Sequence, residues 1–300
     1  MLVSLVYFVL YMEKLQSGLV IEFYSNSCLV RTVNEDIKCL AIKNIVVGDI
    51  VNLELVQDSK ETRGIIISKE PRTSFLQKRE GIKSKAVAAN ISHVGILVTP
   101  EPSTSSEFID KWLVTASSSN IVPFIINNKT DLDQSPDYKQ KLQIYKDLDI
   151  KIINLSAKNN TNTEELKEYL RAKCVVFVGN SGAGKSTLTT KLTGKHIKTN
   201  MLSNNQGVHT TSISTLYELD NQTKIIDSPG VRDLPISGLS SNEIIRGFAE
   251  IYLSSKDCKF SDCNHVANEG CKVLSKLLDG EINESRYNNF IKFRDSDEDG

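Results

Sequence analysis

The fold is decided by the stretch Gly179-Asn180-Ser181-Gly182-Ala183-Gly184-Lys185-Ser186-Thr187, which follows the apolar run Val175-Val176-Phe177-Val178. It fits G-x-x-x-x-G-K-[ST], in which backbone N–H groups of a glycine-rich loop wrap phosphates at the positive end of a helix. We expect Lys185 to neutralise the β- and γ-phosphates of a nucleoside triphosphate and the Ser186 hydroxyl to bind Mg²⁺. The apolar run before the loop and the helix-forming residues after it favour this interpretation over a chance match.

Two motifs upstream of this loop would select the base. The first is Asn128-Lys129-Thr130-Asp131, which fits N-K-x-D. Its carboxylate would accept two hydrogen bonds from the ring N–H and the exocyclic amine of guanine, so Asp131 carries the specificity and Lys129 packs along the base. The second is Ser156-Ala157-Lys158, which follows an apolar run as a second guanine loop would. A polar turn after a buried strand is the alternative for the first motif.

A third motif, Asp227-Ser228-Pro229-Gly230, lies downstream of the phosphate loop and fits D-x-x-G. Asp227 would stand beside the metal ion, and the N–H of Gly230 would reach the γ-phosphate because no side chain obstructs it. In an ordinary GTPase the phosphate loop comes first and the guanine loops follow it. Here the order is reversed, which predicts a circularly permuted GTPase.

The two switch regions offer one candidate catalytic side chain. Many GTPases place a glutamine after D-x-x-G to orient the attacking water, but this chain has Val231 there. The first switch is expected at Gly207-Val208-His209-Thr210-Thr211. We expect His209 to position the water or to handle its proton, and Thr211, or else Thr210, to bind Mg²⁺. A structural role is the alternative for His209.

Three of the six cysteines crowd into one polar stretch together with a histidine. The pattern is Cys258-x4-Cys263-x-His265-x5-Cys271. Zinc takes four such ligands in a tetrahedron, and closed Cys₃His sites are structural. Free cysteines have no packing role in a polar segment, so we expect one structural Zn²⁺ rather than four unrelated residues. The clustering also indicates a reducing compartment instead of a disulfide framework.

The chain divides into three regions that differ in their pattern of strand-forming and helix-forming residues. Residues 15–70 contain short β-rich runs separated by turn residues, which predicts a small five-stranded oligonucleotide-binding barrel, with an SH3-like barrel as the alternative. The polar stretch Lys69–Ile82 is interpreted as a linker. Residues 82–236 alternate strands and helices, which predicts a parallel sheet. Residues 240–295 are helical and hold the cysteine cluster, so the fold class is multidomain α/β.

The composition is that of a soluble globular chain, with 40% hydrophobic and 24% charged residues among 300. A net charge of -1 gives the chain no overall positive field that would attract nucleic acid. Local basic runs are more often simply solvent-exposed faces of the protein. RNA contact would depend on such runs, which are Lys78-Arg79 with Lys83 and Lys85, and Lys195 with Lys198. The apolar residues 1–11 are too short to span a bilayer, and we interpret them as a mis-assigned start. We expect a cytoplasmic monomer without membrane contact.

In its motif order the chain resembles the ribosome small-subunit-dependent GTPase A family. The resemblance runs from Gly18 to Phe293 and rests on the phosphate loop, on the cysteine cluster, on Gly207-x-His209-Thr210-Thr211 and on Asp227-Ser228-Pro229-Gly230-Val231-Arg232. The stretch Lys83-x-x-Ala86-x-x-Ala89-Asn90-Ile91 also resembles the start of that family's permuted domain. The resemblance implies an N-terminal oligonucleotide-binding barrel, a central permuted GTPase and a C-terminal zinc domain. The chain departs from the family in residues 1–11 and in Ser25-Asn26, where a glycine is more usual.

The same resemblance implies a GTP hydrolase that acts late in the maturation of the small (30S) ribosomal subunit, contacts its rRNA and is stimulated by the subunit. A hydrophobic residue at Val231 is a family trait, and the switch histidine is implicated in hydrolysis there. One alternative is an rRNA-binding module that uses GTP mainly as a sensing ligand, which Val231 favours and His209 opposes. Another is a P-loop kinase, which the guanine motif at residues 128–131 opposes.

Overall fold

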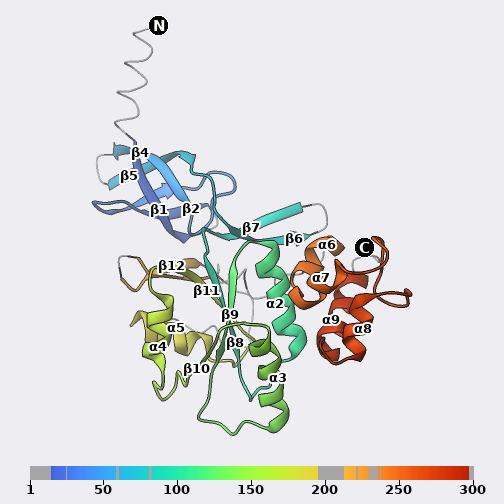
Figure 1. Ribbon diagram of the computed structural model, residues 1–300. Helices are drawn as coiled ribbons and strands as arrows, with labels where there is room; N and C mark the ends of the chain where they lie inside the picture. Colours follow the sequence, from blue (N-terminus) through green and yellow to red (C-terminus); the bar gives the residue numbers. More distant parts are fainter. Residues whose placement is uncertain are drawn as a thin grey trace, which may run out of the picture.

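The computed structural model describes residues 15–24, 26–58, 61–80, 83–194, 213–220, 222–228, 231, 236 and 238–296. Within these ranges the chain forms a barrel, then a sheet flanked by helices, then a small helical module (Figure 1). None of the helices in the described ranges combines the length and the apolar character that a membrane crossing requires.

The N-terminal barrel is a closed ring of β1 (Gln16–Phe23), β2 (Ser27–Arg31), β3 (Asp36–Leu40), β4 (Ile50–Asp58) and β5 (Glu61–Lys69). β1 pairs with β2 and β4, β2 with β3, β3 with β5, and β5 with β4. Alternate residues of β2 and β3 are buried, because one face of each strand points into the barrel. This ring confirms the small five-stranded barrel expected from the sequence.

The central sheet has the order β10 (Ile152–Asn154), β9 (Val122–Asn127), β8 (His93–Val98), β11 (Cys174–Val178), β13 (Lys224–Asp227) and β12 (Ser214–Glu218). The first five strands run parallel, whereas β12 is antiparallel to β13. Helices α2 (Ser106–Ser118) and α3 (Pro136–Asp147) pack on one face, and α4 (Thr163–Leu170) and α5 (Lys185–Thr193) pack on the other. Because both faces are covered, β8 is an almost continuous buried run. The predicted parallel sheet is confirmed.

Strand pairing joins the barrel to the central sheet. β1 pairs antiparallel with β12, where Phe23 lies opposite Ser214. At the other end of β12, Arg31 of the barrel donates to the Glu218 carboxylate at 2.5 Å. Asp36 holds the same guanidinium through two hydrogen bonds of 2.8 Å. The barrel and the central sheet are therefore continuous through β12.

A separate two-stranded hairpin, β6 (Phe75–Glu80) and β7 (Lys83–Ala89), stands between the barrel and the helical module (Figure 1). The polar stretch Lys69–Ile82, which was interpreted as a linker, therefore contains strand β6. Among the hairpin side chains that the structure describes, Leu76 and two alanines of β7 are buried. The apolar residues of the hairpin are consecutive, at 75–76 and 86–89, so the hairpin lacks the alternation that marks a strand in a sequence.

The C-terminal module consists of α6 (Ser241–Arg246), α7 (Ala249–Ser255), α8 (Lys272–Leu278) and α9 (Glu284–Asp295). Its hydrophobic core includes Val114 of α2, so the module is packed onto that helix. Arg286 of α9 is 1% exposed. It donates to Asp110 of α2 at 2.6 Å and to Glu250 of α7 at 2.8 Å. These ion pairs tie the module to the central part of the molecule.

Candidate nucleotide site and metal centre

The predicted nucleotide motifs meet at one edge of the central sheet. Asn128 follows β9, Ser156 lies just after β10, the phosphate loop follows β11, and Asp227 ends β13. These strands are parallel, so their carboxyl ends lie on the same side. Ligands of open α/β sheets bind at this edge. The reversed order of the motifs along the chain therefore has no effect on their convergence in space.

The phosphate loop has the backbone that its glycines permit. Gly182 and Gly184 have φ angles of +79° and +87°, and α5 begins at Lys185 directly after them. A Cβ added to Gly184 would lie 2.4 Å from the carboxamide nitrogen of Asn128. Glycine is thus required at position 184 both by the left-handed conformation and by the closeness of a second motif. Ser186 is half-buried in the first turn of α5.

Asn128 links three loops through its side chain and backbone. Its Nδ2 donates to the Ala183 carbonyl at 2.8 Å, and its Oδ1 accepts from the Ala157 N–H at 3.0 Å. Its own N–H donates to the carbonyl of Val98 at the end of β8. The residue is 2% exposed. Asn128 therefore holds the phosphate loop and the second guanine loop in a fixed relation.

Asp131 is exposed at the same edge. A hydrogen bond from Ser156 lowers the pKa of the Asp131 carboxyl, and the positive charges of Lys158 and Lys129 lower it further. The carboxylate is ionised at neutral pH, which is the form that accepts two hydrogen bonds from guanine. Lys129 has a left-handed backbone, and its Nζ donates to the carbonyl of Glu101 at 2.7 Å.

The D-x-x-G segment is described in part. Asp227 is half-buried, and the Ser228 and Ser214 hydroxyls lie 2.8 Å apart, which ties this segment to the start of β12. Val231 is 1% exposed and belongs to the core cluster that also contains residues of α2. A side chain buried in this way packs rather than orienting a water. The predicted residues His209, Thr211 and Gly230 lie outside the described residues, as does Thr210.

Sequence reasoning missed the loop between β8 and α2. The Glu101 carbonyl receives the Lys129 side chain, and a Cβ on Gly182 would lie 3.5 Å from Pro102. This loop therefore borders both the guanine motif and the phosphate loop. The loop carries no motif. Its position at the carboxyl end of a buried parallel strand is the feature that could have indicated its place at the site.

The four predicted metal ligands are brought together. The ligand atoms of Cys258, Cys263, His265 and Cys271 all lie within 4.8 Å of one another. His265 Nδ1 is 3.7 Å from Cys258 Sγ and 3.6 Å from Cys271 Sγ, and those two sulfurs are 3.9 Å apart. A tetrahedron with metal–sulfur bonds of about 2.3 Å has ligands about 3.8 Å apart. The cluster therefore fits a metal ion.

The surroundings of Cys258 suit a thiolate and those of His265 a neutral imidazole, whereas burial raises the pKa of the Cys271 thiol to about 11. Backbone N–H groups of Lys272 and Val273 point to Cys258 Sγ, and that of Leu274 lies 3.4 Å from Cys271 Sγ. Burial lowers the pKa of His265, and the charge of Arg294 lowers it further, so the imidazole stays neutral. Metal binding requires that form. These N–H groups come from the start of α8, which places the helix against the cluster.

The phosphate loop, the base motif and Asp227 on this sheet, in this order along the chain, define a circularly permuted P-loop GTPase. A model of the RsgA GTPase family matches residues 69–237. The chain therefore belongs to the RsgA GTPase family and is a GTP-hydrolysing enzyme.

Known relatives agree with this assignment over most of the chain. The small ribosomal subunit biogenesis GTPase RsgA of Flavobacterium johnsoniae is 36% identical over 264 residues, which cover 85% of this chain and 81% of that protein. The RsgA of Chlorobaculum parvum is 32% identical over 265 residues, with 84% and 85% covered. The crystal structure of YjeQ from Thermotoga maritima has a TM-score of 0.75 at 32% identity and covers 94% of this chain and 98% of that one. YloQ, a circularly permuted GTPase, has a TM-score of 0.72 at 22% identity and supports the fold.

Proposed function

We propose that this enzyme hydrolyses GTP as a late assembly factor of the small ribosomal subunit, which stimulates its turnover. The two RsgA relatives that are 36% and 32% identical to this chain are named for small ribosomal subunit biogenesis. The observation that carries the proposal is the convergence of the guanine motif, the phosphate loop and Asp227 at one edge of the sheet, where Asn128 ties the phosphate loop to the loop that contains Ala157. Use of GTP only as a sensing ligand is not favoured, because the chain belongs to a family of GTPases.

In the proposed nucleotide site, each motif binds one part of GTP. Asp131 takes the guanine edge, and its exposed, ionised carboxylate supports this role. The loop N–H groups and Lys185 take the phosphates, supported by the left-handed glycines and the start of α5. The full set of proposed GTP-binding residues is Asn128, Lys129, Thr130, Asp131, Ser156, Ala157, Lys158, Gly179, Asn180, Ser181, Gly182, Ala183, Gly184, Lys185, Ser186, Thr187, Asp227 and Gly230.

Mg²⁺ bound with GTP would neutralise charge that develops on the transferred phosphoryl group. The oxygen donors of Ser186 and Asp227 suit this hard cation, and Thr211 is proposed as a further ligand. His209 is proposed to position the attacking water or take its proton. The burial of Val231 supports this assignment, because that side chain packs in the core at the place where other GTPases carry a glutamine.

We propose that the metal of the C-terminal cluster is one structural Zn²⁺ held by Cys258, Cys263, His265 and Cys271. The donor set favours zinc, since three thiolates and one imidazole in a closed tetrahedron are typical of structural zinc sites. The separations of 3.6 to 3.9 Å between ligand atoms support the same geometry.

The proposed domains are residues 15–70, 82–236 and 240–295, with β6 between the first two. The barrel is proposed to contact rRNA, as its oligonucleotide-binding topology suggests. We propose further that the protein works as a monomer in the cytoplasm, away from membranes, where GTP and ribosomal subunits are present.

The function is tested by measuring GTP turnover with and without purified small subunits, and large subunits serve as the control. Stimulation by the small subunit alone is the expected result. His209→Ala should leave GTP affinity near that of the wild type, while stimulated turnover falls roughly a hundredfold, the scale of losing a positioned acid–base group. Equal turnover with either subunit would contradict the function, and a stimulated rate near wild type in His209→Ala would remove that residue from catalysis.

A further inference from the structure

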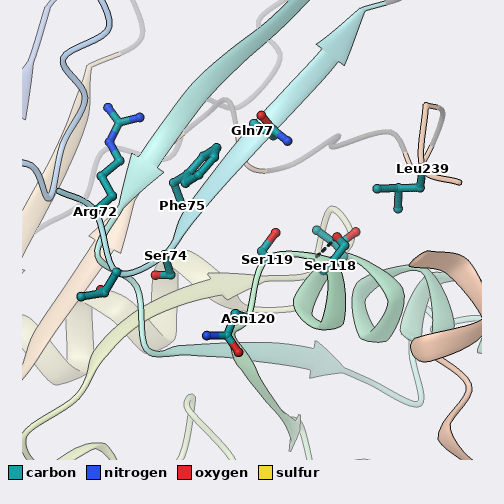
Figure 2. A pocket seen from close by; sticks show the side chains of 10 residues that line it. Arg72, Ser74, Phe75, Gln77, Ser118, Ser119, Asn120 and Leu239 are labelled. Carbon is teal, nitrogen blue, oxygen red and sulfur yellow. Dashed lines mark hydrogen bonds between the residues drawn. The ribbon is translucent and has the colours of Figure 1, made fainter. Parts of the chain in front are cut away.

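A cavity of about 190 Å³ lies at the root of the β6–β7 hairpin. Figure 2 shows side chains from the hairpin, from the carboxyl end of α2 and from Leu239 around it. The cavity is smaller than the roughly 300 Å³ at which sites for drug-sized ligands begin. The space suits one planar ring system.

The cavity contains an aromatic platform held by fixed neighbours. Phe75 is 40% exposed, and the guanidinium carbon of Arg72 lies 5.7 Å from its ring centroid. Arg72 is itself immobilised, because Nε and Nη2 donate to the buried Asp49 carboxylate at 2.7 and 2.8 Å. An exposed ring backed by an anchored cation is an arrangement on which a nucleic-acid base stacks.

The remaining wall offers donors and acceptors without a negative charge. Asn120 is exposed beyond the end of α2 with a φ of 55°, and its carboxamide supplies both kinds of group. The Ser118 hydroxyl donates to the Thr115 carbonyl at 3.0 Å, which leaves its oxygen able to accept. None of the described lining residues is a carboxylate. A base edge presents the complementary mixture of donors and acceptors.

Positive charge lies close to the cavity on the same hairpin. Lys78 and Lys85 are exposed and stand directly opposite each other on β6 and β7. Lys78 is three residues from Phe75, which corresponds to about 10 Å along a strand. This distance is about one Debye length at about 0.1 M salt, so the charge of Lys78 still acts at the cavity. These lysines favour a ligand in which the ring is linked to phosphate groups.

We propose that this cavity holds one unstacked RNA base, with the adjoining phosphates beside the hairpin lysines. The inference rests on the proposed action on the small ribosomal subunit and adds a base-binding site to it. The anchored ring, the amide and the neighbouring cations favour RNA over a protein side chain, which needs no phosphate partner.

The test measures the affinity of the full-length protein, loaded with a non-hydrolysable GTP analogue, for purified small subunits at fixed salt. Phe75→Leu should weaken binding about tenfold, equivalent to about 1.4 kcal/mol, whereas Phe75→Trp should bind like the wild type. Asn120→Gly keeps the left-handed backbone and removes the amide, so weaker binding is expected there too. Phe260→Leu is the matched control, since that ring is 46% exposed beneath Lys259 and should not matter.

Ultraviolet crosslinking of the wild-type complex, followed by mass spectrometry, should place a nucleotide on the peptide that contains Phe75. Wild-type affinity in Phe75→Leu, or a crosslink from this peptide to a ribosomal protein, would overturn the base site alone. Failure of the wild-type protein to bind small subunits would overturn the proposed function and the base site with it. Thermal unfolding of each variant checks that the fold is intact.

Discussion

The carboxamide of Asn128 makes two hydrogen bonds, one to the phosphate loop and one to the second guanine loop. This side chain is 2% exposed, and its two hydrogen bonds hold the loops in place. The close fit extends to Gly184, where any Cβ would collide with the carboxamide nitrogen. At the scale of single residues, one side chain thus links the loops proposed to bind the base and the phosphates.

Gly184→Ala should weaken GTP binding roughly tenfold or more, since a left-handed alanine costs roughly 1–2 kcal/mol and its methyl group displaces Asn128. Gly194 is the matched control, because it is also left-handed, at φ +66°, but has open space around it. Gly194→Ala should therefore lower stability without changing GTP affinity. Nucleotide titrations of both variants measure the difference, and equal affinities would contradict the contact.

The motifs predict which residue types occupy this site, but they do not show which groups the Asn128 side chain contacts. N-K-x-D predicted that Asn128 belongs to the nucleotide site. Its partner at the phosphate loop is a backbone carbonyl 55 residues away, and a carbonyl has no sequence signature. For the same reason the Glu101 carbonyl that holds Lys129 was not predictable.

At the scale of elements, the sequence predicted what has strong periodicity or spacing. The alternating strands of the barrel and the buried parallel strands were predictable because burial imposes a pattern on them. The hairpin β6–β7 was not, because its apolar residues are consecutive rather than alternating, and among the described strands it pairs with no third one. The metal ligands could be predicted from spacing, since zinc demands a fixed set of residue types.

The short helices α6, α7 and α8 contain six or seven residues each. Helices of this length are not stable alone, so metal binding should supply much of the module's folding free energy. Chelation, or Cys263→Ser, should expose residues 258–296 to proteolysis while the barrel stays resistant. Cys174→Ser, which lies outside the cluster, is the control for metal content. Elemental analysis and limited proteolysis test this, and full protease resistance of metal-free protein would contradict it.

At the scale of the whole molecule, two of the junctions between the three parts are well defined. The first is β12, which lies in the sequence between the two switch regions and pairs with β1 of the barrel. A displacement of the barrel would therefore move β12, which separates the two predicted switch regions in the sequence. The second is the buried contact of Arg286 with Asp110 and Glu250, which joins the helical module to α2.

Arg286→Met should lower the free energy of unfolding by about 3–5 kcal/mol, because it leaves Asp110 and most of Glu250 buried without a counter-charge. Lys292→Met is the matched control, since Lys292 pairs with Glu107 across the same two helices at 2.8 Å, but both side chains are about half exposed. Exposed pairs contribute at most about 1 kcal/mol. Urea unfolding of both variants measures these changes. A loss in Arg286→Met as small as that in Lys292→Met would show that the apolar contacts of Val114, and not the buried charges, hold the module in place.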